Sequence, residues 1–284
     1  MSADAQVEAG PRRLSRLAWL PATLLVGGGI VLFWILVAIL GPRISPYDPI
    51  AIDIAHSLLH PDGQHWLGTD SFGRDLLTRL MYGASTDLQM SFFGVVGPFI
   101  IRTTVGLLAG NYGGRADTVL MRILDVTVSF PYFVLVIAII AVLQPGLISY
   151  YISLTLVNWV SYARLVRSQV IVLKHADFVL AARTIGLGEL RVMTHHLLPN
   201  SIAPAVVFVM TDAVLTIVLG SSLGFLGLGV QPPAAEWGVM IAEGQLYLGI
   251  AWWISVFPGL AIALLALGFS LVADGLAKLL HTSQ

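Results

Sequence analysis

Long apolar runs without charge alternate with short charged stretches along most of the chain. A helix needs about 20 apolar residues to cross the roughly 30 Å hydrocarbon core of a bilayer. One run, 126–163, is too long for a single crossing, and Pro145 and Gly146 divide it into two spans. Runs with at most one charge cover residues 17–40, 126–163, 200–235 and 244–273. These runs predict five membrane-spanning helices.

A sixth span is predicted over residues 88–110, where Arg102 interrupts the apolar run and Pro98 should kink the helix. The first span is expected to stay in the mature protein as a helix rather than to be cleaved as a signal peptide. Its apolar run is too long for the core of a signal peptide and lacks a small-residue cleavage site. The pattern therefore predicts an all-α membrane protein with six transmembrane helices.

Composition agrees with a membrane protein. Hydrophobic residues make up 57% and charged residues 11% of the 284-residue chain, whereas about a quarter of the residues in soluble domains are charged. The net charge of -1 argues against nucleic acid as a partner. The chain has no cysteine, which excludes disulfides, thiolate metal sites and thiol catalysis but says nothing about the compartment.

Positive charges gather on one side of the six predicted spans. Twelve Lys and Arg fall at the two termini, in the loops 111–117 and 164–199 or close to their ends, and three fall on the other side. Cytoplasmic loops carry an excess of Lys and Arg, so both termini are expected in the cytoplasm. The opposite side receives two loops, about 42–86 and 226–243.

The stretch 177–199 combines charge, helix formers and glycines between two long apolar segments. Asp177 is expected to cap a first short helix, Gly186 and Gly188 interrupt it, and Pro199 is expected to end a second one. The apolar stripes of the two helices are Val179, Ala182 and Ile185, and Leu190, Met193 and Leu197. A pair of helices with one apolar and one charged face suits a groove on a partner, although an ordinary amphipathic loop has the same pattern.

Both outer loops have structure of their own. In the first, Thr69 or Asp70 is expected to cap a helix with an apolar stripe. That stripe consists of Leu76, Leu77, Leu80 and Met81, and it lies opposite Arg74, Asp75 and Arg79. The second loop, from Gly224 to Met240, is rich in glycine and proline and is expected to pack over a pathway, because irregular backbone at the bilayer edge needs protein or water around it. Asp70, Arg74, Asp75, Glu236 and Trp237 are the candidate contacts of these loops.

Arg102 and Asp212 lie within or near the membrane, where a charge faces a cavity or a partner. They are candidate charges of a pathway or of the helix bundle. Structural pairing of such charges is the alternative to solute contact, and Arg122 with Asp125 is one example at i, i+3. Arg102 has a further alternative, since its long side chain can extend to the inner surface.

Three histidines, His56, His60 and His65, suggest a metal site, but Pro61 and Gly63 make this segment a turn. Glu236 and Glu243 lack the partners of a catalytic site, so no enzyme activity is expected. Small residues at i, i+4 allow close approach of helices, either within the chain or at a subunit interface. These pairs are Gly106 with Gly110 and Gly220 with Gly224.

Three segments together resemble one family. The stretch 177–199 is similar to the EAA loop of binding-protein-dependent ABC importer permeases, with Ala181, Ala182 and Gly186 in place and Leu198 and Pro199 at the expected distance. Leu180 stands where that loop has its glutamate. The segments Trp66–Gly83 and Leu223–Met240 resemble signature segments of the dipeptide, oligopeptide and nickel branch.

The resemblance implies a type I importer domain in the inner membrane, with this loop inserted as a coupling helix into a groove of an ATPase. It assigns ATPase coupling to Ala181, Ala182, Gly186, Leu198 and Pro199. The implied partners are a second permease, two ATPase subunits that bind ATP and Mg²⁺, an extracytoplasmic binding protein and membrane lipid. The implied organisation is an N-terminal helix and outer loop over 1–83, a core over 84–275 with the coupling loop at 174–200, and a tail over 276–284.

The chain itself has no phosphate-binding loop, because neither of its lysines, Lys174 and Lys278, follows a glycine. No cofactor of its own is expected, and ATP hydrolysis must lie on another chain. Peptides are the expected cargo, and nickel and glutathione are alternatives. A standalone secondary carrier is an alternative of another class, since six helices with buried charges also suit ion coupling.

Overall fold

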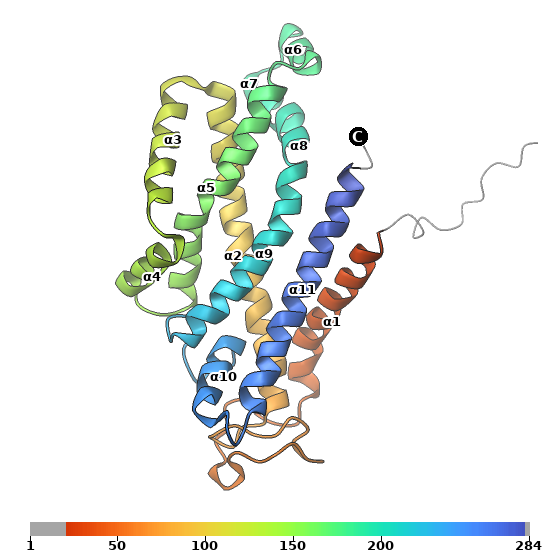
Figure 1. Cartoon of the computed structure of the whole chain (residues 1–284). Helices are drawn as coiled ribbons and strands as arrows, with labels where there is room; N and C mark the ends of the chain where they lie inside the picture. Colours follow the sequence, from red (N-terminus) through yellow and green to blue (C-terminus); the bar gives the residue numbers. More distant parts are fainter. Residues whose placement is uncertain (1–20, 282–284) are drawn as a thin grey trace, which may run out of the picture.

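The structure is a computed structural model that describes residues 21–281. Over that range all regular elements are helices (Figure 1), and the β-type pairing consists of one isolated bridge between Thr69 and Asp75. The long helices are α1 (Ala22–Ile44), α2 (Leu76–Tyr112), α3 (Gly114–Ser129), α4 (Tyr132–Leu143), α5 (Leu147–Leu173), α9 (Ala203–Phe225) and α11 (Trp253–His281). The short elements are η2 (Ile54–His56), α6 (Asp177–Thr184), α7 (Glu189–Val192), the π-helical turn η3 (Met193–Leu197), α8 (Leu198–Ser201), α10 (Trp237–Gly244) and η4 (Gln245–Tyr247).

Four helices among the described residues are long and apolar enough to cross a membrane alone: α1, α2, α9 and α11. A fifth candidate span is the pair α3 and α4, which is bent by 93° at a short break. This differs from the single span expected between residue 126 and Pro145. Pro131 has no N–H to donate and it immediately precedes α4, so the chain changes direction there. The six-span count remains a prediction.

Helix boundaries also differ from expectation around α2. The amphipathic segment that starts near Leu76 is not a separate helix but the first turns of α2, which continues through the buried Pro98 to Tyr112. Its cap is Asp75, whose carboxylate accepts from the Thr78 N–H at 2.7 Å, rather than Thr69 or Asp70. The last helix starts at Trp253, because residues before it form η4 and a turn.

The helix α2 lies at the centre and packs against α5, α1 and α9, while α11 packs against α1, α9 and α10. Glycines allow the backbone of one helix to lie close to its neighbour at some of these contacts. A Cβ on Gly106 would lie 2.7 Å from the Ala163 carbonyl oxygen of α5, and one on Gly220 would lie 2.7 Å from Met90 of α2. Both predicted glycine pairs therefore serve packing within the chain.

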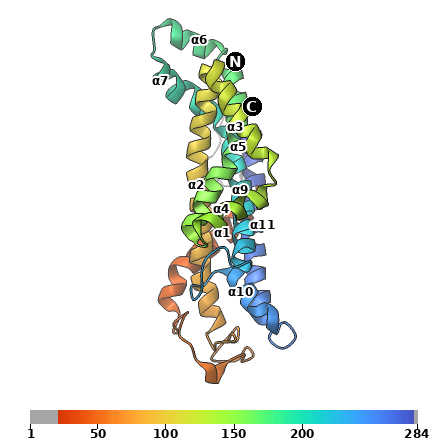
Figure 2. The same cartoon turned by 90° about the vertical axis from the view of Figure 1, so that its left-hand side faces the viewer.

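The two ends of the bundle differ (Figures 1 and 2). The described ends of α1 and α11 lie toward the end that carries α6 and α7. The segment 45–75 and α10 lie at the opposite end. The described ends of α1 and α11 thus lie at the same end of the bundle as the 177–199 stretch, and the length of the bundle separates the two candidate sites. The side of the membrane that each end faces remains a prediction.

Candidate functional site

The 177–199 stretch forms a projecting unit of two short helices, α6 and α7, joined by a glycine turn (Figure 1). The turn has the hydrogen bonds of a Schellman motif: Gly186 N–H donates to the Arg183 carbonyl and Leu187 N–H to the Ala182 carbonyl. Gly186 has φ +85, which a side chain with a Cβ adopts only at a cost. The predicted helix pair is thus confirmed, although the Asp177 side chain makes no cap hydrogen bond.

The unit is fixed to the bundle by part of its apolar surface. Val179, Met193 and Leu197 are buried in a cluster with Leu107 of α2 and Tyr162, Val166 and Val170 of α5. Ile185 and Leu190 were expected in the same stripes, but they are 78% and 74% exposed. The turn between the helices directs these two side chains away from the bundle, so the unit presents an apolar surface outward.

Polar contacts tie the same unit to the end of α2. Arg183 pairs with Glu189 at 3.0 Å, and its Nη2 donates to the Asn111 side-chain oxygen at 2.9 Å. The Asn111 amide donates to Glu189 at 3.1 Å, and this hydrogen bond, with Arg183 nearby, lowers the pKa of Glu189. Lys174 donates to the Gly110 carbonyl at 3.1 Å. These contacts connect the 177–199 unit with the end of α2.

The five residues assigned to coupling fall in this unit with different exposures. Ala181, Gly186 and Pro199 are exposed, Leu198 is half-buried and Ala182 is buried in the packed face. Pro199 does not end the second helix as expected. It occupies the first turn of α8, where a missing N–H is tolerated, and the helical path continues into α9.

At the opposite end, four charged side chains form a buried cluster that joins the 45–75 segment to α10. Arg74 contacts Asp70 at 2.6 Å and Glu243 at 2.8 Å, and Arg79 contacts Glu243 at 2.9 Å. Asp70, Arg74 and Arg79 are each less than 5% exposed. Arg79 and Glu243 were not predicted as site residues, because their partners are distant in sequence.

The remaining outer candidates are also engaged inside the protein. Asp75 caps α2 and contacts the His65 ring at 2.9 Å. Glu236 caps α10 by accepting from the Gly238 and Val239 N–H groups, and burial raises its pKa to about 7. Trp237 is buried against Trp34 of α1. These residues make contacts within this end of the bundle, and their contact with a partner stays a prediction.

The two predicted membrane charges pair with each other. Arg102 of α2 contacts Asp212 of α9 at 3.1 Å, with side chains 0% and 7% exposed, and its guanidinium lies 4.6 Å from the Tyr162 ring centroid. Pairing was expected, but Arg122 with Asp125 was the wrong example, because Asp125 contacts Arg164 instead. Extension of Arg102 to the surface is also wrong, since the residue is fully buried.

The three histidines have separate partners. His56 contacts Asp53, His65 contacts Asp75, and the His56 and His65 ring centroids are 6.3 Å apart. The His60 ring lies 4.4 Å from the Trp253 ring centroid, with the two planes tilted by 48°. Over residues 21–281, no group of three potential metal ligands is found.

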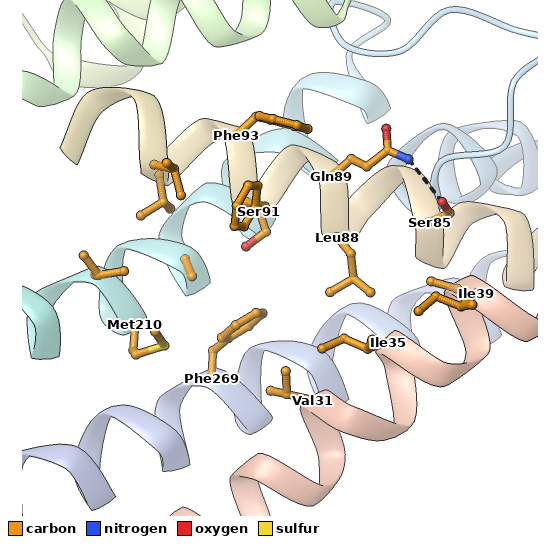
Figure 3. A pocket seen from close by; sticks show the side chains of 16 residues that line it. Val31, Ile35, Ile39, Ser85, Leu88, Gln89, Ser91, Phe93, Met210 and Phe269 are labelled. Carbon is orange, nitrogen blue, oxygen red and sulfur yellow. Dashed lines mark hydrogen bonds between the residues drawn. The ribbon is translucent and has the colours of Figure 1, made fainter. Parts of the chain in front are cut away.

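An apolar cavity of about 540 Å³ lies between α1, α2, α9 and α11 (Figure 3). Val31, Ile35, Leu88, Met210 and Phe269 line it, and at its edge the Gln89 amide donates to Ser85 at 3.2 Å. This lining suits hydrocarbon, such as a lipid chain, and offers few hydrogen-bonding groups to a polar solute.

Comparisons with known proteins agree with this architecture. The family described as "Binding-protein-dependent transport system inner membrane component" matches residues 102–283, and "N-terminal TM domain of oligopeptide transport permease C" matches residues 23–61. The dipeptide transport system permease protein DppC of Alkalihalophilus pseudofirmus is 42% identical over 89% of this chain and 83% of that protein. The glutathione transport system permease protein GsiD of Pectobacterium atrosepticum is 38% identical over 88% of this chain and 83% of that protein.

A solved structure shares the fold. One chain of the MetNI methionine ABC transporter in inward-facing conformations aligns with a TM-score of 0.52 at 18% identity, over 70% of this chain and 96% of that chain.

Proposed function

The chain belongs to the family of binding-protein-dependent transport system inner membrane components, and from this membership we propose that it is the permease subunit of an ATP-driven importer of dipeptides and oligopeptides. Its proposed partners are a second, related permease, two ATPase subunits that bind ATP and Mg²⁺, and an extracytoplasmic binding protein. Names of relatives such as the dipeptide permease DppC support peptides as the cargo. The name of the relative GsiD supports glutathione as a second candidate, and nickel remains a third.

The proposed arrangement has six spans, with both termini and the 177–199 unit in the cytoplasm. The excess of Lys and Arg near that end supports it. In this orientation the segment 45–75 and α10 face the binding protein. The solute would pass between this chain and its paired permease.

The observation that carries the proposal is the 177–199 unit, which is packed on the bundle by one face and exposes Ile185 and Leu190 on the other. Closure of two ATPase subunits would move the exposed face, and the contacts of Arg183 and Lys174 with the end of α2 would transmit that movement. Alternating access follows from a reorientation of the helices around the pathway.

Substitution at Gly186 tests the coupling role. A Cβ at this position meets no atom within 4 Å, so Gly186→Val acts through the backbone alone, because φ +85 costs a residue with a side chain about 1–2 kcal/mol. In the assembled transporter, uptake and transport-coupled ATP hydrolysis should fall while the subunits still co-purify. Gly186→Asn should retain more activity, since asparagine tolerates this conformation.

Gly188→Val is the matched control, because Gly188 has φ -64 and also meets nothing within 4 Å. Unchanged uptake in Gly186→Val would contradict the coupling role. Reconstitution separates the classes of transporter: the purified chain alone should move no solute across liposomes, and transport by it alone would favour a secondary carrier.

A further inference from the structure

A cavity of about 380 Å³ lies at the break between α3 and α4. Its walls are the residues of the break, including Thr127, Phe130 and Tyr132, and one turn of α5 with Val157 and Asn158. In contrast to the apolar cavity between α1 and α11, this one has a hydroxyl, a phenol and an amide in its lining. Among the described residues, no charged side chain lines it.

The backbone at this break needs polar surroundings. The last four carbonyl groups of a helix have no partner within the helix, and irregular backbone at membrane depth occurs only where protein or a water-filled cavity satisfies it. Ser129 donates to one of these carbonyls, that of Val126, at 2.7 Å. Because α3 and α4 together qualify as one membrane span and are bent by 93°, the break lies within that span, and the cavity beside it supplies a polar environment.

The side chains in the cavity are placed to meet a solute. Tyr132 is 42% exposed and Phe130 is 54% exposed, so the cavity opens toward the outside of this chain. The Tyr132 hydroxyl interacts with the Asn158 amide, and both groups can donate as well as accept a hydrogen bond. Two charges that act on Tyr132, those of Arg102 and Asp212, are buried and contact each other.

This chemistry matches a neutral amide group. A peptide backbone carries one donor and one acceptor per residue, and side chains of Tyr, Asn and Thr can bind both without the strong attachment that a charged partner gives. Passage through a membrane pathway needs binding that is favourable enough for entry and weak enough for exit. An uncharged polar cavity satisfies both requirements.

We propose that this cavity is part of the solute pathway, and that Tyr132, Asn158 and Thr127 contact the backbone amides of a passing peptide. The inference rests on the proposed function as a peptide permease. It places the solute pathway beside α4 and α5, away from the apolar cavity that lies between α1 and α11.

Cysteine labelling tests this directly, because the chain has no cysteine of its own. Asn158→Cys and Thr127→Cys are introduced singly into the complete transporter in proteoliposomes, and a membrane-impermeant methanethiosulfonate is added. Leu156→Cys is the matched control, since Leu156 lies on the same helix, is 54% exposed and does not line the cavity. Modification is read on this chain by mass spectrometry, and uptake of labelled dialanine is measured in parallel.

Both cavity cysteines should be modified at least tenfold faster than the cysteine at position 156, and their modification should block uptake. Dialanine with the binding protein should slow the reaction. Tyr132→Phe should raise the KM for uptake with little change in ATP hydrolysis. No labelling of either cavity cysteine in a transporter that takes up dialanine overturns the pathway assignment and leaves the proposed function intact. Absence of dialanine uptake by the unsubstituted transporter overturns the proposed cargo instead.

Discussion

Replacing Asp212 by Asn is expected to destabilise the helix bundle strongly. The substitution keeps the size of the side chain but removes the one charge that contacts Arg102 among the described residues, at 3.1 Å between two buried groups. The Nε and Nη2 atoms of Arg102 have no hydrogen-bond partner among the described residues, so no hydrogen bond from these atoms can replace the lost ion pair. The Tyr162 ring at 4.6 Å is present before and after the substitution and does not compensate for the loss.

The magnitude follows from the burial of the pair. Removing one partner of a buried ion pair costs about 3–5 kcal/mol, because an uncompensated charge remains in a medium of low dielectric constant. Every 1.4 kcal/mol is about a tenfold change in an equilibrium constant, so unfolding should become at least a hundredfold more favourable. Replacing both residues by apolar ones, as in Arg102→Met with Asp212→Leu, should recover most of this loss.

The assay is unfolding of the purified protein in mild detergent by titration with SDS, followed by circular dichroism. Wild type, the two single variants Arg102→Met and Asp212→Asn, and the apolar double variant are compared. If Asp212→Asn is as stable as wild type, or if the double variant is no more stable than Asp212→Asn, the contact between α2 and α9 does not have the energetic role derived from its geometry.

Two further changes test the packing around α10. Burial raises the pKa of Glu236 to about 7, so the folded protein keeps a proton that the unfolded chain releases from about pH 4.5 upward. The free energy of unfolding should therefore fall by on the order of 3 kcal/mol as the pH rises from about 4.5 to about 7. Thermal unfolding measured across this pH range should show the loss of stability, and Glu236→Gln should make stability nearly independent of pH. A wild-type protein whose stability does not change with pH would refute the raised pKa of Glu236. Gly224→Ala should destabilise by about 1–3 kcal/mol, because its Cβ would lie 2.1 Å from the Glu236 carboxylate. In contrast, Gly28→Ala on α1, where a Cβ meets nothing within 4 Å, should be neutral or slightly stabilising in the same measurement.

The sequence predicted best what depends on local pattern. Apolar runs located α1, α9 and α11, because a span needs only length and hydrophobicity. The glycines at 186 and 188 predicted the turn between α6 and α7, and Gly186 has the positive φ that favours glycine, whereas Gly188 does not. Pro131 is a local signal for the break between α3 and α4, and the prediction that only Pro145 and Gly146 interrupt that run is wrong.

What could not be predicted depends on partners that are distant in sequence. Arg74 and Asp70 lie in a segment rich in turns and charges, which is typical of a solvated loop. Arg74 contacts Glu243, which is 169 positions beyond it, and Asp70 in turn pairs with Arg74. Likewise, the sequence predicted no particular partner for Arg102, and the packing of α2 on α9 places Asp212 beside it.

The length of α2 has a consequence for how the two ends of the molecule communicate. At 37 residues it measures about 55 Å, and it carries the Arg79 contact to α10 near its start and the Asn111 contact to the 177–199 unit near its end. A tilt of about 5° about one end of a rod of this length moves the other end by about 5 Å. A small rotation imposed at the 177–199 unit therefore reaches the opposite end of the bundle without a chain of intermediate contacts, unless the helix flexes at Pro98.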